Sequence, residues 1–331
     1  MTRHMFAGVM TPAGFVDFFD HIMPLENARR RYYLKGASGS GKSTFIKKIA
    51  AGLASSNFNI DFFHCANDAA SLDGMAVKEL GFSIIDATMP HSHDPELPAA
   101  IDVIIDFAQF LDGAKVTKHI SEIMRLTTLK KRHFGQAQKF LSMIGGVLAE
   151  EKIATATPTE KDLAREYVNS FTKNDTLIGY NRKMFLSAVT SDGVKNFNNI
   201  LDAYKIHKID GNSAAFLEEV KSYANVSGVN TESFYCPLQP TNILHLVIPQ
   251  GGIVFTNVCN QIGYLDNATA THEIIKSLLN SAISEMKAAR SFHEKIEKIY
   301  ISAMNFAGIN NIADKILDEC RHNILPSCPS L

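Results

Sequence analysis

The segment Gly36-Ala37-Ser38-Gly39-Ser40-Gly41-Lys42-Ser43 has the residue types and the spacing that phosphate binding requires. Its glycines allow backbone N–H groups to surround an anion, and its lysine and serine suit phosphate oxygens and Mg²⁺. A chance glycine-serine turn is the simpler alternative. The pattern G-x-x-x-x-G-K-[ST] favours a site for ATP and Mg²⁺, formed by Gly36, Ala37, Ser38, Gly39, Ser40, Gly41, Lys42, Ser43 and Thr44.

The sequence on either side of this segment supports the same prediction. Residues 31–35 before it favour a strand, and residues 42–55 after it carry apolar residues at helical spacing. Phosphate loops occur between a strand and the start of a helix, where unpaired N–H groups add donors. In this context Lys42 is expected to reach the outer phosphates as a catalytic residue, and Ser43 to ligate Mg²⁺.

A second group of polar residues follows the apolar run Phe82–Ile85. Asp86 closes this run and is expected to help hold Mg²⁺, with a turn-capping aspartate as the alternative. Thr88 is a candidate for positioning a water molecule, and His91 for contacting the γ-phosphate. His91 is equally compatible with a surface histidine, or with a zinc site that includes His93 but lacks further ligands. All of them belong at the carboxyl end of a strand, where open α/β sheets bind ligands.

Two sets of charged residues are further candidates. Asp68 and Asp73 follow an expected strand and suit a general base, a substrate contact or turn caps. Four basic residues of a helical region suit either a cation that reaches the γ-phosphate or a solvated helix face: Arg125, Lys130, Lys131 and Arg132.

Hydrophobic spacing predicts alternating strands and helices in the first half of the chain. Strands are expected near residues 4–10, 31–35, 58–63 and 81–86, and helices near 12–23, 42–55 and 97–112. This alternation indicates parallel strands joined by right-handed crossovers. Residues 115–151 have a helical pattern throughout, which predicts a helical hairpin or lid outside the sheet.

The second half of the chain repeats the first half. Arg3-His4-Met5-Phe6 is echoed by Arg182-Lys183-Met184-Phe185, and Phe63-His64-Cys65 by Phe234-Tyr235-Cys236. The strands of the repeat are expected near 183–189, 204–209, 231–236 and 252–258, and its helices near 191–201, 213–224, 268–289 and 290–320.

The repeat has lost the residues that would bind phosphate. The positions of Lys42, Ser43, Asp73 and Asp86 are taken by Ser213, Ala214, Leu244 and Asn257. Loss together with the loop favours a functional role for a residue, whereas retention favours a structural one. The sequence therefore predicts one active half and one degenerate half.

These patterns predict an α/β protein with the P-loop NTPase fold, built from two duplicated three-layer αβα halves with parallel sheets and helical insertions. Residues 1–152 are expected to form the P-loop domain with its lid-like helical region, and residues 179–331 the degenerate domain. Residues 153–178 are expected to form a connector with a polar helix near 159–173.

Composition excludes several classes of partner. The 331 residues include 33 Lys and Arg and 34 Asp and Glu, so overall charge gives no indication of nucleic acid or a membrane surface. The five cysteines form no C-x-x-C pair, which favours a reduced, cytoplasmic protein over a disulfide framework. The start of the sequence lacks the pattern of a signal peptide, and no apolar run is long enough for a membrane span.

The chain resembles a bacterial family of tandem P-loop proteins whose members are labelled ATPase or nucleotide kinase. The resemblance rests on Arg3-His4-Met5-Phe6, Thr11-Pro12-x-Gly14-Phe15, Lys35 to Ser43, Phe62-Phe63-His64-Cys65 and Ile84-Ile85-Asp86-x-Thr88-x-Pro90-His91. It implies ATP binding but no particular substrate, and the degenerate second loop departs from the family pattern.

Three functions are compatible with this sequence. The first is a Mg²⁺-dependent ATPase that uses the N-terminal site, with the C-terminal half as an inactive regulatory duplicate. The second is a nucleotide or small-molecule kinase, and the third is a nucleotide-binding switch without enzymatic activity. The expected partners are ATP or another NTP and an unidentified protein or phosphate acceptor.

Overall fold

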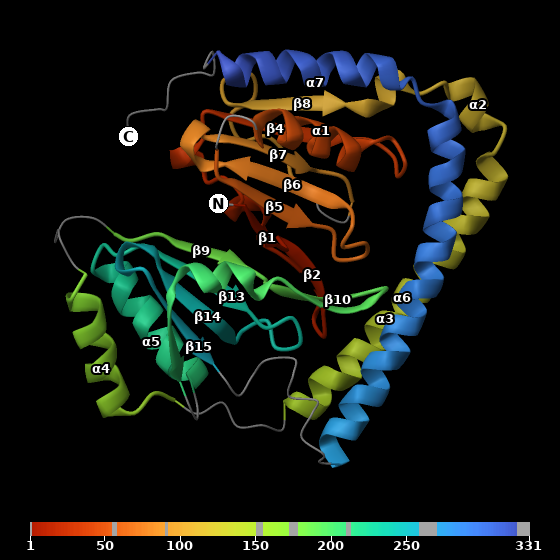
Figure 1. The fold of residues 1–331 in the computed structure, drawn as a ribbon. Coiled ribbons are helices and arrows are strands. Elements are labelled where there is room, and N and C mark those ends of the chain that lie inside the picture. The colour runs from red at the N-terminus through yellow and green to blue at the C-terminus, as the bar shows by residue number, and fades with distance from the viewer. Residues whose placement is uncertain are drawn as a thin grey trace.

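The computed structural model describes residues 2–54, 58–89, 92–149, 155–171, 178–209, 213–257 and 270–322. In this part of the chain, two mixed α/β units lie one above the other, and a pair of long helices runs beside both (Figure 1). Both main sheets contain parallel strands. The structure is therefore an α/β protein, as the sequence predicts.

The first unit is built on a six-stranded sheet with the order β1-β5-β6-β7-β4-β8. Its strands are β1 (Arg3–Met5), β4 (Arg30–Lys35), β5 (Ile60–His64), β6 (Leu72–Val77), β7 (Phe82–Asp86) and β8 (Asp102–Asp106). The expectation of an all-parallel sheet is wrong, because β6 runs antiparallel to both of its neighbours. The segment that joins β5 to β6 is too short for a crossover, so the chain turns back directly.

The helix expected near residues 12–23 is wrong. Strands β2 (Gly8–Thr11) and β3 (Gly14–Asp17) form an antiparallel hairpin there, followed by short 3₁₀ turns. Gly14 adopts a positive φ of 110°, and the Thr11 hydroxyl donates to its carbonyl at 2.8 Å, which fixes the tight turn. The strand expected near 4–10 is accordingly divided into β1 and β2.

The helix expected near residues 97–112 is also wrong. This stretch contains β8 and a 3₁₀ helix, Phe107–Phe110. The β-branched run Val103-Ile104-Ile105 favours a strand, and β8 pairs with β4 along its length. Helix α1 (Lys42–Ala54) begins where the sequence predicts it.

The second unit repeats this architecture with a five-stranded sheet in the order β12-β15-β14-β13-β9. The expected helix near 191–201 is replaced by a hairpin strand and a 3₁₀ helix, as in the first unit. The elements are β9 (Asn181–Met184), β10 (Ser187–Thr190), β11 (Gly193–Asn196), the 3₁₀ helix Asn198–Ala203, β12 (Lys205–Ile209), α5 (Ser213–Val226), β13 (Thr231–Tyr235), β14 (Ile243–Ile248) and β15 (Ile253–Asn257).

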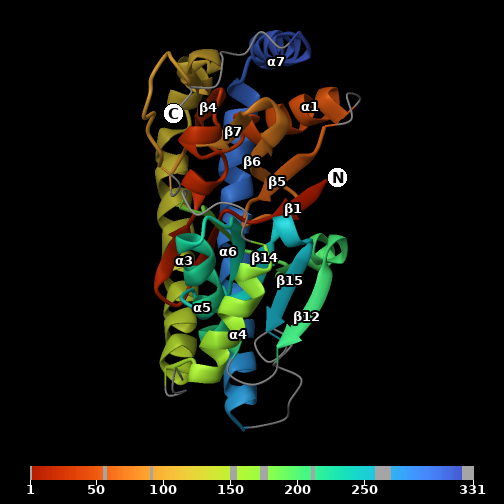
Figure 2. The same ribbon diagram turned by 90° about the vertical axis from the view of Figure 1, so that its left-hand side faces the viewer.

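The long helices are α3 (Ile120–Leu148) and α6 (Ala270–Ala303), with the short α2 (Gly113–Thr117) before α3. Figures 1 and 2 show them packed side by side and running in opposite directions. The expected hairpin or lid within 115–151 is therefore wrong: α3 is one continuous helix, and its partner is α6. The break expected between residues 289 and 290 is also wrong, since α6 continues to Ala303.

The helix that follows each long helix packs on the opposite unit. Helix α4 (Pro158–Asn169) follows α3 but packs on α5 of the second unit, whereas α7 (Phe306–Arg321) packs on α1 of the first (Figure 1). Ile309, Ala313 and Ile316 of α7 complete the hydrophobic core around α1 and β4. The C-terminal helix thus contributes to the unit that carries the phosphate loop, which the expected division at residue 179 did not anticipate.

None of the helices in the described ranges combines the length and the apolar composition that crossing a bilayer requires.

Candidate functional site

The predicted phosphate loop is an open turn between β4 and α1. Gly39 and Gly41 adopt positive φ values of 78° and 94°, and α1 starts directly after them at Lys42. Within the described residues, no hydrogen bond accepts from the amides of Gly39, Gly41 or Lys42. Left-handed residues next to free amides and a helix start produce the concave donor surface that binds anions.

Lys42 lies folded over this loop. Its ammonium donates to the carbonyls of Gly36 at 2.8 Å and Ala37 at 3.0 Å, and its Nζ lies 3.6 Å from Oδ2 of Asp86. The side chain is 91% buried, since only 9% of it is exposed. The charge is thus stabilised by the loop itself and by one carboxylate, and a phosphate group would replace the two carbonyls as its partner.

Asp86 and Thr88 converge on the loop from β7. Leu34 of β4 pairs with Asp86, so the two strands place this carboxylate beside the start of the loop. The Thr88 amide donates to Asp86 Oδ1 at 3.0 Å, and its hydroxyl donates to the Gly36 carbonyl at 3.3 Å. The structure therefore brings together Lys42, Asp86 and Thr88, whereas His91 lies outside the described residues.

Ser43 connects the loop to β6. Its Oγ accepts a hydrogen bond from the Leu72 amide at 2.9 Å. Asp73, the next residue of β6, is buried and follows in register opposite Asp86, because Gly74 pairs with Ile85. Burial and the nearby Asp86 carboxylate raise the pKa of Asp73 to about 8. Asp73 is thus part of the site.

Asp68 has a different role from Asp73, although the sequence placed both in one group. Its carboxylate accepts from the Ser71 hydroxyl at 2.8 Å and lies 3.2 Å from the Arg290 guanidinium on α6. Arg290 also pairs with Asp192 at 2.7 Å, in the hairpin turn of the second unit. Asp68 therefore fastens its loop to the long helix and to the second unit.

The remaining predicted residues divide by exposure. Ala37 and Ser38 are half-buried, Thr44 is exposed, and Ser40 is buried with no partner for its hydroxyl among the described residues. Of the four basic candidates, Arg125, Lys131 and Arg132 are exposed. Lys130 is half-buried on α3, with its Nζ 3.4 Å from Nδ1 of His293 on α6.

Residues near the C-terminus also contact the loop. A Cβ placed on Gly39 would lie 2.6 Å from the carbonyl oxygen of Glu297 on α6, and one on Gly41 would lie 3.0 Å from the Phe306 ring on α7. Both glycines are therefore required for packing as well as for backbone conformation. Sequence analysis missed Glu297 and Phe306, because neither belongs to a motif and both are distant in the chain.

The donor set fits Mg²⁺ bound to phosphate better than a metal bound by protein alone. No group of three or more His, Cys, Asp or Glu side chains in the described part of the chain is arranged to hold a metal ion. Ser43 and Asp86 offer oxygen atoms next to the loop, and Mg²⁺ commonly uses few protein oxygens together with substrate phosphates and water.

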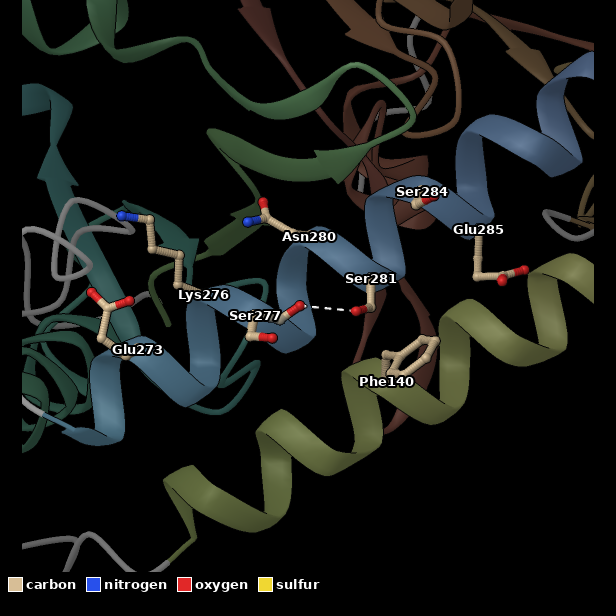
Figure 3. Close-up of a pocket in the computed structure, with 8 residues that line it drawn as sticks. All are labelled: Phe140, Glu273, Lys276, Ser277, Asn280, Ser281, Ser284 and Glu285. Atoms are coloured by element: carbon tan, nitrogen blue, oxygen red, sulfur yellow. Dashed lines mark hydrogen bonds between the residues drawn. The ribbon is translucent and has the colours of Figure 1, made fainter.

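A hollow of about 620 Å³ lies elsewhere, along α6 (Figure 3). Its lining includes the polar side chains of Lys276 and Asn280 and the ring of Phe140 from α3. Its lining residues come from the long helices alone, so it is separate from the phosphate loop.

The second unit has no equivalent of this site in its described residues. Helix α5 starts with Ser213 and Ala214, and the buried side chains of Leu244 and Asn257 occupy the positions of Asp73 and Asp86. The turn before α5, residues 210–212, lies outside the described residues.

Comparison of the chain with protein-family models, with curated proteins and with solved structures gives no match.

Proposed function

We propose that this protein has the P-loop NTPase fold in its first unit and acts as a Mg²⁺-dependent ATPase through that unit alone. The observation that carries the proposal is the turn between β4 and α1, with left-handed Gly39 and Gly41 and with Lys42 Nζ 3.6 Å from Asp86. A loop of free amides, one ammonium group and one carboxylate is the minimum equipment for holding Mg²⁺ and a polyphosphate.

Each residue has a distinct role in this proposal. Lys42 leaves the Gly36 and Ala37 carbonyls and binds the outer phosphates, while Ser43 and Asp86 hold Mg²⁺. Mg²⁺ supplies positive charge against the phosphate oxygens. Thr88, already turned toward the loop by its bond to Gly36, orients the attacking water.

The second unit serves as an inactive duplicate with a regulatory position. Helix α6 begins beside the second unit and reaches the phosphate loop at Glu297. Arg290 of the same helix pairs with both units, through Asp68 and Asp192. The duplicate is thus mechanically connected to the site without carrying phosphate-binding groups of its own.

Thermal unfolding with Mg·ATP tests the proposal. At about 100 times the dissociation constant, ATP should stabilise the protein by about 2.7 kcal/mol. Lys42→Ala should remove most of this shift, whereas the matched variant Ser213→Ala in the second unit should retain it. A wild-type melting curve that does not respond to nucleotide would contradict the proposal. Labelled ATP then distinguishes an ATPase, which releases free phosphate, from a kinase, which labels an added acceptor.

A further inference from the structure

A second cavity, of about 360 Å³, lies where the segment after β8 meets the junction of α6 and α7. Leu111 and Met304 pair in an antiparallel bridge at this point. The Asp112 amide donates to the Ala303 carbonyl at 2.9 Å, and the Asn305 amide donates to the Phe110 carbonyl at 2.8 Å. These bonds fix the two walls of the cavity relative to each other.

Both walls continue into residues that touch the phosphate loop. Phe107, just before the first wall, has its Cβ 2.8 Å from the position of a Cβ on Gly36. Phe306, just after the second wall, has its ring 3.0 Å from that of Gly41. The cavity therefore adjoins the loop near its first and last glycines. It also lies at the carboxyl end of β8, which is the neighbour of β4.

The lining combines an aromatic ring with polar groups. Phe110 offers an apolar face, while Asp112 and Asn305 offer a carboxylate and an amide. Asp112 Oδ1 accepts from the Lys115 amide at 3.2 Å, and its side chain remains 44% exposed. The volume lies within the range of small-molecule sites, in which apolar walls and a few polar groups orient the ligand.

We propose that this cavity holds the base of the nucleotide whose phosphates bind the loop, and that it selects a purine with an exocyclic amino group. This inference rests on the proposed function. The Phe110 ring packs against the base, and the Asp112 carboxylate accepts a hydrogen bond from the amino group. The Asn305 amide reads a neighbouring ring atom. The described part of the second unit contains no strand in the position of β8, so the cavity is present only beside the intact loop.

Calorimetric binding of three magnesium complexes tests this inference: Mg·ATP, Mg·ITP, which lacks the amino group, and Mg·tripolyphosphate, which lacks the base. Asp112→Asn keeps an acceptor for the Lys115 amide, so the helix start is preserved. It should weaken ATP binding about tenfold, because a charged acceptor is lost, and leave tripolyphosphate unchanged. Wild-type protein should prefer ATP to ITP. Lys276→Ala, in the separate hollow on α6, is the matched control and should change none of the three.

The outcomes separate the two proposals. If ATP binds and Asp112→Asn lowers only ATP affinity, the base site is supported. If wild-type protein binds ATP no better than tripolyphosphate, or Asp112→Asn weakens neither, the base site is overturned while the phosphate loop stands. If neither ATP nor tripolyphosphate binds wild-type protein, the proposed function itself fails.

Discussion

The two units of this protein share a frame but not a site. Both contain a strand, a hairpin, a 3₁₀ turn, a strand, a helix and three antiparallel-linked strands in the same order. At the carboxyl end of the sheet the first unit carries charged and hydroxyl groups, where the second carries shorter, neutral or apolar ones: Ser213, Ala214, Leu244 and Asn257. The frame is therefore stable without the phosphate-binding residues, and the loop is an addition to it.

The units contribute equally to a buried ionic cluster between them. Arg3 pairs with Asp61 at 2.7 Å in the first unit, and Arg182 occupies the matching register opposite Glu232 in the second. The pairs also cross over, with Arg3 at 2.7 Å from Glu232 and Arg182 at 2.6 Å from Asp61. Each guanidinium thus neutralises a carboxylate of the other unit.

The largest expected effect comes from breaking this cluster. Arg182→Met and Arg3→Met should each lower the free energy of unfolding by about 3–5 kcal/mol, because each leaves buried carboxylates without a partner. Urea unfolding measures the loss, and Arg165→Met, at an exposed pair on α4, should have little effect. A cost for Arg3→Met that is several times the cost for Arg182→Met would show that the units do not share the cluster equally.

The exchanged helices provide the next comparison. Ile316→Ala on α7 removes a buried side chain from the core of the first unit and should cost about 2–5 kcal/mol. Val168→Ala on α4 removes fewer carbon atoms from the core of the second unit and should cost less. Chemical denaturation of both variants tests this order. Equal stability of Ile316→Ala and wild-type protein would show that α7 is not part of the first core.

Acid should weaken the contact between the units. Burial opposes ionisation of Asp61, but the Arg182 charge and the Arg3 hydrogen bond outweigh it and lower its pKa from 3.8 to about 2. A lowered carboxylate pKa stabilises the folded state above the unfolded value, and this stability disappears as pH falls from about 4 to about 2. The expected loss is about 2 kcal/mol. Unfolding measured across this interval should be flatter in Arg182→Met, and an equally steep loss in that variant would assign the acid sensitivity to other groups.

The smallest effect concerns a pair of surface contacts with reversed charge. Lys48 of α1 pairs with Asp314 of α7 at 2.7 Å, whereas Glu219 of α5 pairs with Lys161 of α4 at 3.4 Å. Double-mutant cycles with alanine should give about 0.2–1 kcal/mol for each pair, because the charges are partly exposed. A coupling of zero for both pairs would mean that apolar packing alone directs each helix to its unit.

The part of this structure that could be predicted from the sequence is the part encoded locally. The phosphate loop, β4, α1 and the position of Asp86 follow from contiguous patterns, and the repeat places their counterparts. Short apolar runs were harder: residues 72–77 were not recognised as β6, and 102–106 were assigned to a helix. A run of five or six apolar residues has no period long enough to distinguish a strand from a buried helix.

The covering of the loop had no local signal at all. Glu297 and Phe306 reach Gly39 and Gly41 only because α6 is long enough to extend from the second unit to the first. Asp73 was recognisable through its loss in the repeat, but its separation from Asp68 required the register between β6 and β7. Contacts between distant segments depend on how the elements are assembled, and spacing along the chain does not encode that.

The exchange of α4 and α7 has a consequence for biosynthesis. A ribosome finishes the phosphate-loop unit's strands early but makes α7, which covers α1, only with residues 306–321. Until then the nascent first unit exposes apolar side chains that α7 will bury, so it cannot close independently during translation as an ordinary N-terminal domain does. Nucleotide capture is thereby reserved for chains that have been synthesised almost to their end.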